Sequence, residues 1–137
     1  QDNTVLNFMN KIIVEVSIGE LLDKISILEI KQGKIKDPEK LKFINNEHSI
    51  LKNQFENNVK SDEKLDGLYQ SLKEINAKLW VIEDDKRQCE KDKDFGEKFI
   101  KLSRDVHFLN DDRAKIKLEI NNHTGSTIKE IKEYTGY

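Results

Sequence analysis

Acidic side chains spaced three residues apart are the first feature of this sequence that could support catalysis. On a helix, this spacing places two carboxylates on one face, as in helical nucleotide hydrolases that depend on Mg²⁺. The pairs are Glu20/Asp23, Glu63/Asp66, Asp94/Glu97 and Glu130/Glu133. Because roughly five such pairs are expected by chance at this content of acidic residues, they predict neither a metal site nor a cofactor.

Known catalytic motifs give no further candidate. The sequence contains no HExxH, CxxC, GxxxxGKS/T or GxSxG pattern, so no residue is predicted to be catalytic. Cys89 is the only cysteine, and no neighbour in the sequence would activate its thiol. Since a lone cysteine cannot form an internal disulfide, we expect a reducing, cytoplasmic setting.

Arginines 87, 104 and 113 are the residues best suited to bind an anion, because a guanidinium can hold a carboxylate or phosphate with two hydrogen bonds. All of them lie in the last two predicted helices, so an anion-binding face would lie between those helices. Glu83 is expected roughly opposite Arg104, where an ion pair would join the two helices. Salt bridges within the protein are the favoured interpretation over ligand binding.

Two polar residues occupy positions where the apolar seam of a helix would have leucine. His48 and Arg113 are both expected at about the level of Lys73, inside the packed helices. Arg113 is expected to pair with a nearby carboxylate such as Asp23 or Glu74. We interpret His48 as a hydrogen-bonded core histidine in preference to a metal ligand.

Helix-capping signals define the elements that must position these side chains. Ser17 with Glu20 forms a capping box, which predicts a helix from residue 18. Asp37-Pro38 ends that helix and begins a second, which runs to about residue 59. Ser61 is expected to open the third and longest helix.

A fourth helix follows the polar residues 91–94. Asp94 with Glu97 resembles a cap for this helix, which is expected to end near Asn121-Asn122 and Gly125. Apolar residues recur at alternating spacings of three and four, which is typical of bundle helices. The sequence therefore predicts a mainly α fold, an antiparallel four-helix, coiled-coil-like bundle.

Short strands are expected at both ends of this bundle. Residues 11–16 are β-branched and predict a strand with Ile12, Val14 and Val16 on one face. Residues 126–134 are interpreted as extended, and both segments should meet and pair at one end of an up-down bundle. Because a lone two-stranded ribbon leaves unpaired edges, two copies could join their ribbons into a four-stranded sheet, which predicts a homodimer.

Length and charge limit the remaining possibilities. A chain of 137 residues fits a single domain, here residues 11–134, with residues 1–10 as an extension or tag and 135–137 as a tail. With 24 basic and 26 acidic residues, the net charge of −2 gives no overall attraction to nucleic acid. No apolar run approaches about eighteen residues, so no membrane span is expected.

Three stretches carry a resemblance to a known family: residues 14–31 (VEVSIGELLDKISILEIK), 78–87 (KLWVIEDDKR) and 110–121 (NDDRAKIKLEIN). They resemble small uncharacterised proteins of bacteria and their phages, over nearly all of residues 11–134. The resemblance implies an accessory role beside glycosyltransferases of surface-polysaccharide pathways and supplies no catalytic residue. Its pattern points to six polar positions as a ligand- or partner-binding set: Glu83, Asp84, Arg87, Arg104, Asn110 and Arg113.

Three functions are compared at this point. A non-enzymatic interaction or accessory module is favoured, because helix packing alone explains apolar heptads with charged residues between them. Its partner would be another protein, such as a glycosyltransferase. The alternative is a binder of an anion or sugar nucleotide, or a small all-helical enzyme, since residues 21–28 loosely resemble the first helix of all-helical chorismate mutases. Those enzymes use an early arginine, and here none precedes Arg87. Nucleic-acid binding is disfavoured by the interspersed acidic residues.

Overall fold

The computed structural model describes residues 10–137, and these residues form helices without any strand. The helices are α2 (Ile18–Lys34), α3 (Pro38–Asn58), α4 (Glu63–Asp92) and α5 (Glu97–Thr124). The prediction of a mainly helical protein with four helices in this part of the chain is therefore confirmed. The proposed extension over residues 1–10 lies almost entirely outside the described residues.

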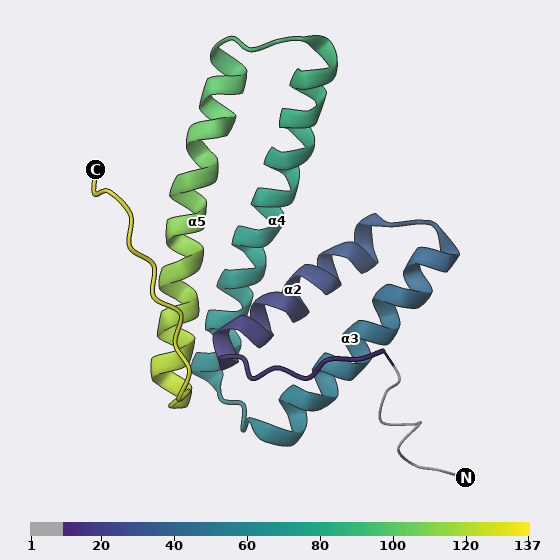
Figure 1. The fold of residues 1–137 in the computed structure, drawn as a ribbon, viewed down its shortest axis with the longest axis vertical. Helices are drawn as coiled ribbons and strands as arrows, with labels where there is room; N and C mark the ends of the chain where they lie inside the picture. The colour runs from purple at the N-terminus through teal and green to yellow at the C-terminus, as the bar shows by residue number, and fades with distance from the viewer. Residues whose placement is uncertain (1–9) are drawn as a thin grey trace.

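The helices form two hairpins that cross each other (Figure 1). Helix α2 is the central element, because it packs against α3, α4 and α5, while α4 and α5 pack along each other. The α2–α3 hairpin is inclined to α4–α5 and meets it near the end where α4 begins and α5 ends. The other end of the α4–α5 hairpin projects beyond α2. We call residues 77–92 and 97–109 the arm.

The predicted caps of α2 and α3 are confirmed. Ser17 is the N-cap of α2, where its hydroxyl accepts a hydrogen bond from the Glu20 backbone N–H at 3.0 Å. Asp37 caps α3 by accepting from the Glu39 N–H at 3.0 Å, and Pro38 occupies the first helical position. Each side chain thus satisfies a backbone donor at the start of its helix that would otherwise be free.

The later helices begin one or two residues beyond the predicted caps. Asp62, not Ser61, is the N-cap of α4 and accepts from the Leu65 N–H at 2.7 Å. Gly96 is the N-cap of α5, while Asp94 accepts from the Gly96 N–H at 3.1 Å within the turn. Gly125 ends α5 with a φ of 68°, in the left-handed region that glycine adopts most easily.

The hydrophobic core lies where the two hairpins meet. Helices α2, α3, α4 and α5 all contribute to it, through Leu22, Ile25, Phe55, Leu65, Leu72 and Ile120. Ile25, Leu72 and Ile120 have no solvent-exposed surface. The crossing point is therefore the best-packed part of the described molecule.

The predicted terminal strands are wrong, because the described residues form no strand, so the ribbon that was expected to join two copies is absent there. Residues 11–16 are exposed coil, and Ile12 keeps 91 % of its surface accessible, because no other segment pairs with them. The residues after Ser126 instead run back along α5 (Figure 1), where Lys132 pairs with Asp111 at 3.1 Å. The ends of the helical region do meet as expected, since the Ile18 N–H donates to the Ser126 hydroxyl at 3.3 Å.

Candidate functional site

Polar residues recur every three positions along α2 and form its contacts with the other hairpin. Glu20, Asp23, Ser26 and Glu29 all bond to side chains of α3, α4 or α5, or of the segment after α5. Each step of three residues turns the direction by about 60°, so neighbouring members share a side whereas Glu20 and Glu29 point toward different helices. We call these residues and their partners the polar junction.

Asp23 is the centre of the polar junction and is 2 % exposed. The Arg113 guanidinium donates to both of its carboxylate oxygens, with Nε 2.9 Å from Oδ1. Asn76 of α4 donates to Asp23 Oδ1 and to Ser26 Oγ, each at 2.8 Å. The hydrogen bond to Asp23 raises the pKa of Arg113 above its ordinary value. The predicted pairing of Arg113 with Asp23 is therefore confirmed.

Gly19 allows α2 to approach α5 closely. Its N–H donates to Asn121 Oδ1 at 2.7 Å, and a Cβ at this position would lie 2.6 Å from the Lys117 carbonyl oxygen. Lys117 itself is 12 % exposed and donates to Glu20 at 2.7 Å and to Glu130 at 2.9 Å. Burial lowers the pKa of Lys117, but its two carboxylate partners outweigh burial and raise it. Three segments of the chain therefore share one ammonium group.

Glu29 links α2 to both α3 and α4. It accepts from the Tyr69 hydroxyl and from Lys73 Nζ at 3.3 Å, and His48 Nε2 lies 2.9 Å from its second oxygen. Burial would raise the pKa of Glu29, but the hydrogen bonds from Tyr69, His48 and Lys73 together lower it below its ordinary value. Burial, followed by the bond to Glu29, raises the pKa of Tyr69. The prediction that His48 is hydrogen-bonded inside the fold is confirmed.

The buried polar groups of the polar junction are all satisfied within the protein. Over residues 10–137, every buried side-chain nitrogen or oxygen has a hydrogen-bond partner. The same residues contain no cluster of three or more side chains suited to a metal ion. The arrangement is that of a structural crossing, in which buried charges are neutralised by their neighbours.

The six polar residues highlighted by sequence fall into separate places. Glu83 pairs with Arg87 at 3.0 Å within α4, and both side chains are more than half exposed. Asn110 Oδ1 lies 3.5 Å from Arg113 Nη1 at the edge of the polar junction. Asp84 is exposed, and Arg104 lines a surface hollow of the arm. The predicted ion pair between Glu83 and Arg104 is absent from the described residues, because Arg87 lies one helical turn from Glu83.

Sequence reasoning missed the open face of the arm. Two hollows lie along this face and share Asp105 and Phe108. The larger, of about 610 Å³, is lined by Ala77, Lys78, Val81, Ile82, Asp105, Phe108 and Leu109. Val81 is 48 % exposed and Phe108 37 %. By helical periodicity this face is opposite the side of α4–α5 that carries the contacts to α2.

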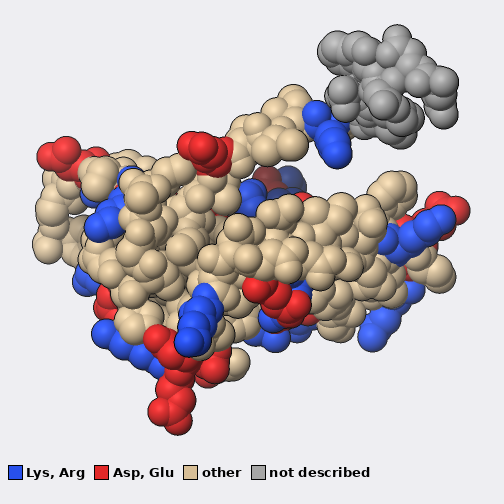
Figure 2. Space-filling view, turned by 90° about the horizontal axis from the view of Figure 1, so that it is seen from below, with Lys and Arg blue, Asp and Glu red and all other residues tan. Residues whose placement is uncertain are grey.

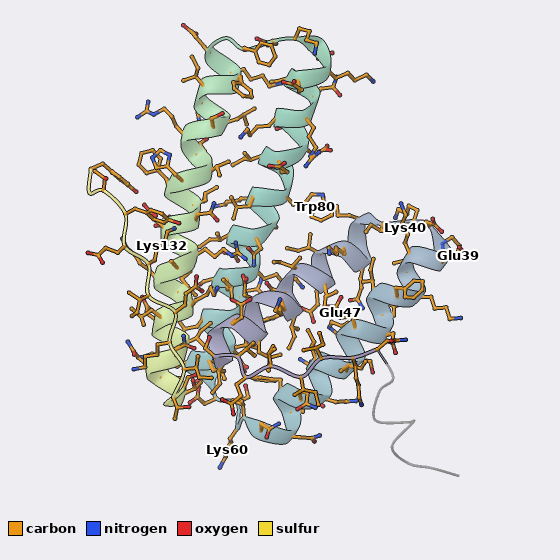
Figure 3. The ribbon with its side chains drawn as sticks, viewed as in Figure 1. Glu39, Lys40, Glu47, Lys60, Trp80 and Lys132 are labelled. Carbon is orange, nitrogen blue, oxygen red and sulfur yellow. The ribbon has the colours of Figure 1, made fainter. Side chains whose placement is uncertain are left out.

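The seam between α4 and α5 is only half-buried within the arm. Leu79, Ile82, Leu102, Val106 and Leu109 all keep part of their surface accessible, and Cys89 is the only fully buried residue there. At the crossing, by contrast, Leu65 and Leu72 of the same helix are almost completely buried. Trp80 projects from α4 on the side of the α2–α3 hairpin (Figure 3), so it does not cover the open face. The apolar heptad residues of the arm thus lack the packing partners that the same heptad positions have at the crossing.

Residues 12–137, which contain both the polar junction and the arm, match the sequence profile of a family of unknown function, DUF6165. The chain belongs to this family. The matched region includes all four described helices and the segment that returns along α5. Searches of curated proteins and of solved structures found no match. Over residues 10–137, no helix combines the length and the hydropathy that crossing a bilayer requires.

Proposed function

We propose that this protein is a non-enzymatic helical interaction module and that the open face of the arm binds another protein chain. The observation that carries this proposal is the half-buried seam of the arm, beside an exposed apolar stripe that includes Val81 at 48 % and Ile100 at 55 %. Such a stripe on a helical pair is typical of a surface that a further helix covers. The polar junction serves this role by fixing the arm to the rest of the molecule.

A role in surface-glycan biosynthesis, as an accessory to a bacterial or phage glycosyltransferase, is the biological setting that we propose. Its support is the resemblance carried by residues 14–31, 78–87 and 110–121. The single, buried Cys89 favours a reducing, cytoplasmic setting for this interaction. Nucleic acid is a poor candidate for a partner, because Lys and Arg lie among Asp and Glu on the face seen in Figure 2, without an extended patch of one sign.

Photo-crosslinking from the arm tests the proposed function. A benzoylphenylalanine placed at Ile100 should form a covalent adduct with an identified protein chain in cells that also express the glycosyltransferase of the same locus. Ile50 is the matched control, since it is an isoleucine of α3 with 52 % exposure against 55 % for Ile100. An adduct at position 100 and not at position 50 supports the proposal. Absence of any protein adduct at position 100 contradicts it.

Binding of an anion or sugar nucleotide is the second candidate function, and one observation favours it. Arg104 makes no salt bridge within residues 10–137 and lines the smaller hollow of the arm beside Lys101. Two cations at one hollow could hold a diphosphate that displaces Asp105, the present partner of Lys101 at 2.7 Å. Titration calorimetry with a uridine diphosphate sugar would detect this binding, and loss of the signal in Arg104→Ala would assign it to the hollow.

A further inference from the structure

We infer that the chain covering the arm is the arm of a second copy, so that two α4–α5 hairpins close into one intermolecular four-helix bundle. This inference rests on the proposed function, because it names the occupant of the surface proposed there. A glycosyltransferase would then bind the dimer through another surface.

The number of helices is the first argument for a second copy. A four-helix core needs two further helices to cover an open two-helix seam, and an identical arm supplies two helices of matching length. Such a pair would cover Val81, Ile82 and Phe108, which line the open face, from both copies at once. Two-fold dimers of this kind are the commonest closed assemblies of soluble proteins.

Access is the second argument. The arm projects beyond the α2–α3 hairpin (Figure 1), and the open face lies on the opposite side of α4–α5 from α2. A second arm can therefore approach this face without meeting α2 or α3, and it would lie beside Tyr137, whose ring packs edge-on against Phe108 with centroids 5.2 Å apart. Residues on the same side nearer the crossing are exposed and polar, namely Gln70, Glu74, Asp112 and Glu119. Leu118, five helical turns from Ile100 on α5 and 40 % exposed, is the exception to this polar character, so the expected contact is centred on the arm.

Charge is the third argument. The open face carries three cations, Lys78, Lys101 and Arg104, and two anions, Glu97 and Asp105. A two-fold interface must be complementary to itself, so a mixture of both signs suits a second copy better than a strongly acidic or basic partner. Lys101 and Asp105 already pair at 2.7 Å, whereas neither Glu97 nor Arg104 has an ion-pair partner within residues 10–137. A second copy would offer each of them an opposite charge.

Light scattering on the purified chain tests the inference. At micromolar concentration, we expect about twice the 16.1 kDa mass of one chain. Val81→Lys and Ile100→Lys should each weaken the dimer at least about tenfold, because each places an ammonium in an apolar contact. Ile50→Lys is the matched control and should leave the dimer unchanged, since Ile50 is equally exposed but lies on α3. Circular dichroism verifies that all three variants keep their helices.

The outcomes separate this inference from the proposed function. A wild-type monomer, or a dimer that persists in both arm variants, overturns the inference. If the protein is a monomer and position 100 still crosslinks to the glycosyltransferase, the arm is a protein-binding surface with a different occupant. If the protein is a monomer and position 100 crosslinks to no protein, both proposals fail.

Discussion

At the residue scale, Gly19 lets the backbones of α2 and α5 approach each other closely. We predict that Gly19→Ala destabilises the fold by about 1–3 kcal/mol, because the added Cβ would lie 2.6 Å from the Lys117 carbonyl and 2.9 Å from Asn121 Oδ1. Gly67→Ala is the control, since nothing lies within 4 Å of its added Cβ, and it should stabilise α4 by about 0.5–1 kcal/mol. Urea unfolding measures both effects. Equal stability of the two variants would contradict the close approach.

Asp23 and Arg113 form the pair whose disruption should be most costly. We predict that Arg113→Leu destabilises the protein by about 3 kcal/mol, because Asp23 is 2 % exposed and would lose its ion-pair partner. Adding Asp23→Asn removes the stranded charge, so the double variant should recover at least about 1 kcal/mol. Thermal or urea unfolding of the three variants provides the comparison. A double variant that is less stable than Arg113→Leu would show that the unpaired charge of Asp23 is not the main cause of the lost stability.

The same pair shows what the sequence can predict about a site. Arg113 was expected to pair with a carboxylate such as Asp23 or Glu74, because it occupies a seam position where a buried charge needs a partner. Glu83 was expected beside Arg104 because the two residues lie at similar heights on neighbouring helices. Both Glu83 and Arg87 are exposed, however, and Glu83 pairs with Arg87 one turn away on its own helix. The burial of a position, which follows only from the packing of whole helices, decides which of these two outcomes occurs.

At the element scale, Glu29 joins α2 to α3 and α4, and its lowered pKa has a predictable consequence for stability. A carboxyl whose pKa is lower in the folded state than its ordinary value of 4.5 stabilises the fold above that value. This contribution is lost as the pH falls through the lower, folded-state pKa. We predict that the stability difference between the wild type and Glu29→Gln is largest at neutral pH and shrinks as the pH falls below the ordinary value of 4.5.

Urea unfolding at several pH values measures this difference. Glu47→Gln is a suitable control, because Glu47 is an exposed residue of α3 (Figure 3). Its effect on stability should hardly change over the same pH range. A Glu29→Gln difference that stays constant with pH would contradict a role for the ionised carboxylate in holding α2, α3 and α4 together.

Helix boundaries were predicted far better than the terminal segments. The caps at Ser17 and Asp37 depend on a few adjacent residues, so local sequence is enough to place them. Residues 11–16 have a high intrinsic preference for strand, but a strand also needs a neighbour with free backbone groups. The Ser126 hydroxyl accepts a hydrogen bond from the Ile18 N–H at the start of α2. The residues beyond Ser126 are held on α5 by two ion pairs, Glu130 with Lys117 and Lys132 with Asp111. No strand partner is then available among the described residues.

At the scale of the whole molecule, the sequence indicated which faces of the helices are apolar but not what covers them. Leu79, Ile82 and Leu102 have the spacing of a closed bundle, and from the pattern alone they are indistinguishable from Leu65 and Leu72. Only the inclined crossing of the two hairpins separates a covered half of α4–α5 from an uncovered half. The surface on which both proposals rest therefore could not be identified before the fold was known.

The single crossing point also makes the arm a lever. About 24 Å of helix lies between Asn76, which bonds to α2, and Asp92 at the far end of α4, at a rise of about 1.5 Å per residue. A rotation of about 5° at the crossing would therefore carry the tip of the arm through about 2 Å, a displacement sufficient to misalign side chains in a packed interface. The buried hydrogen bonds around Asp23 thus fix the orientation of the arm and of its open face, although they lie outside that face.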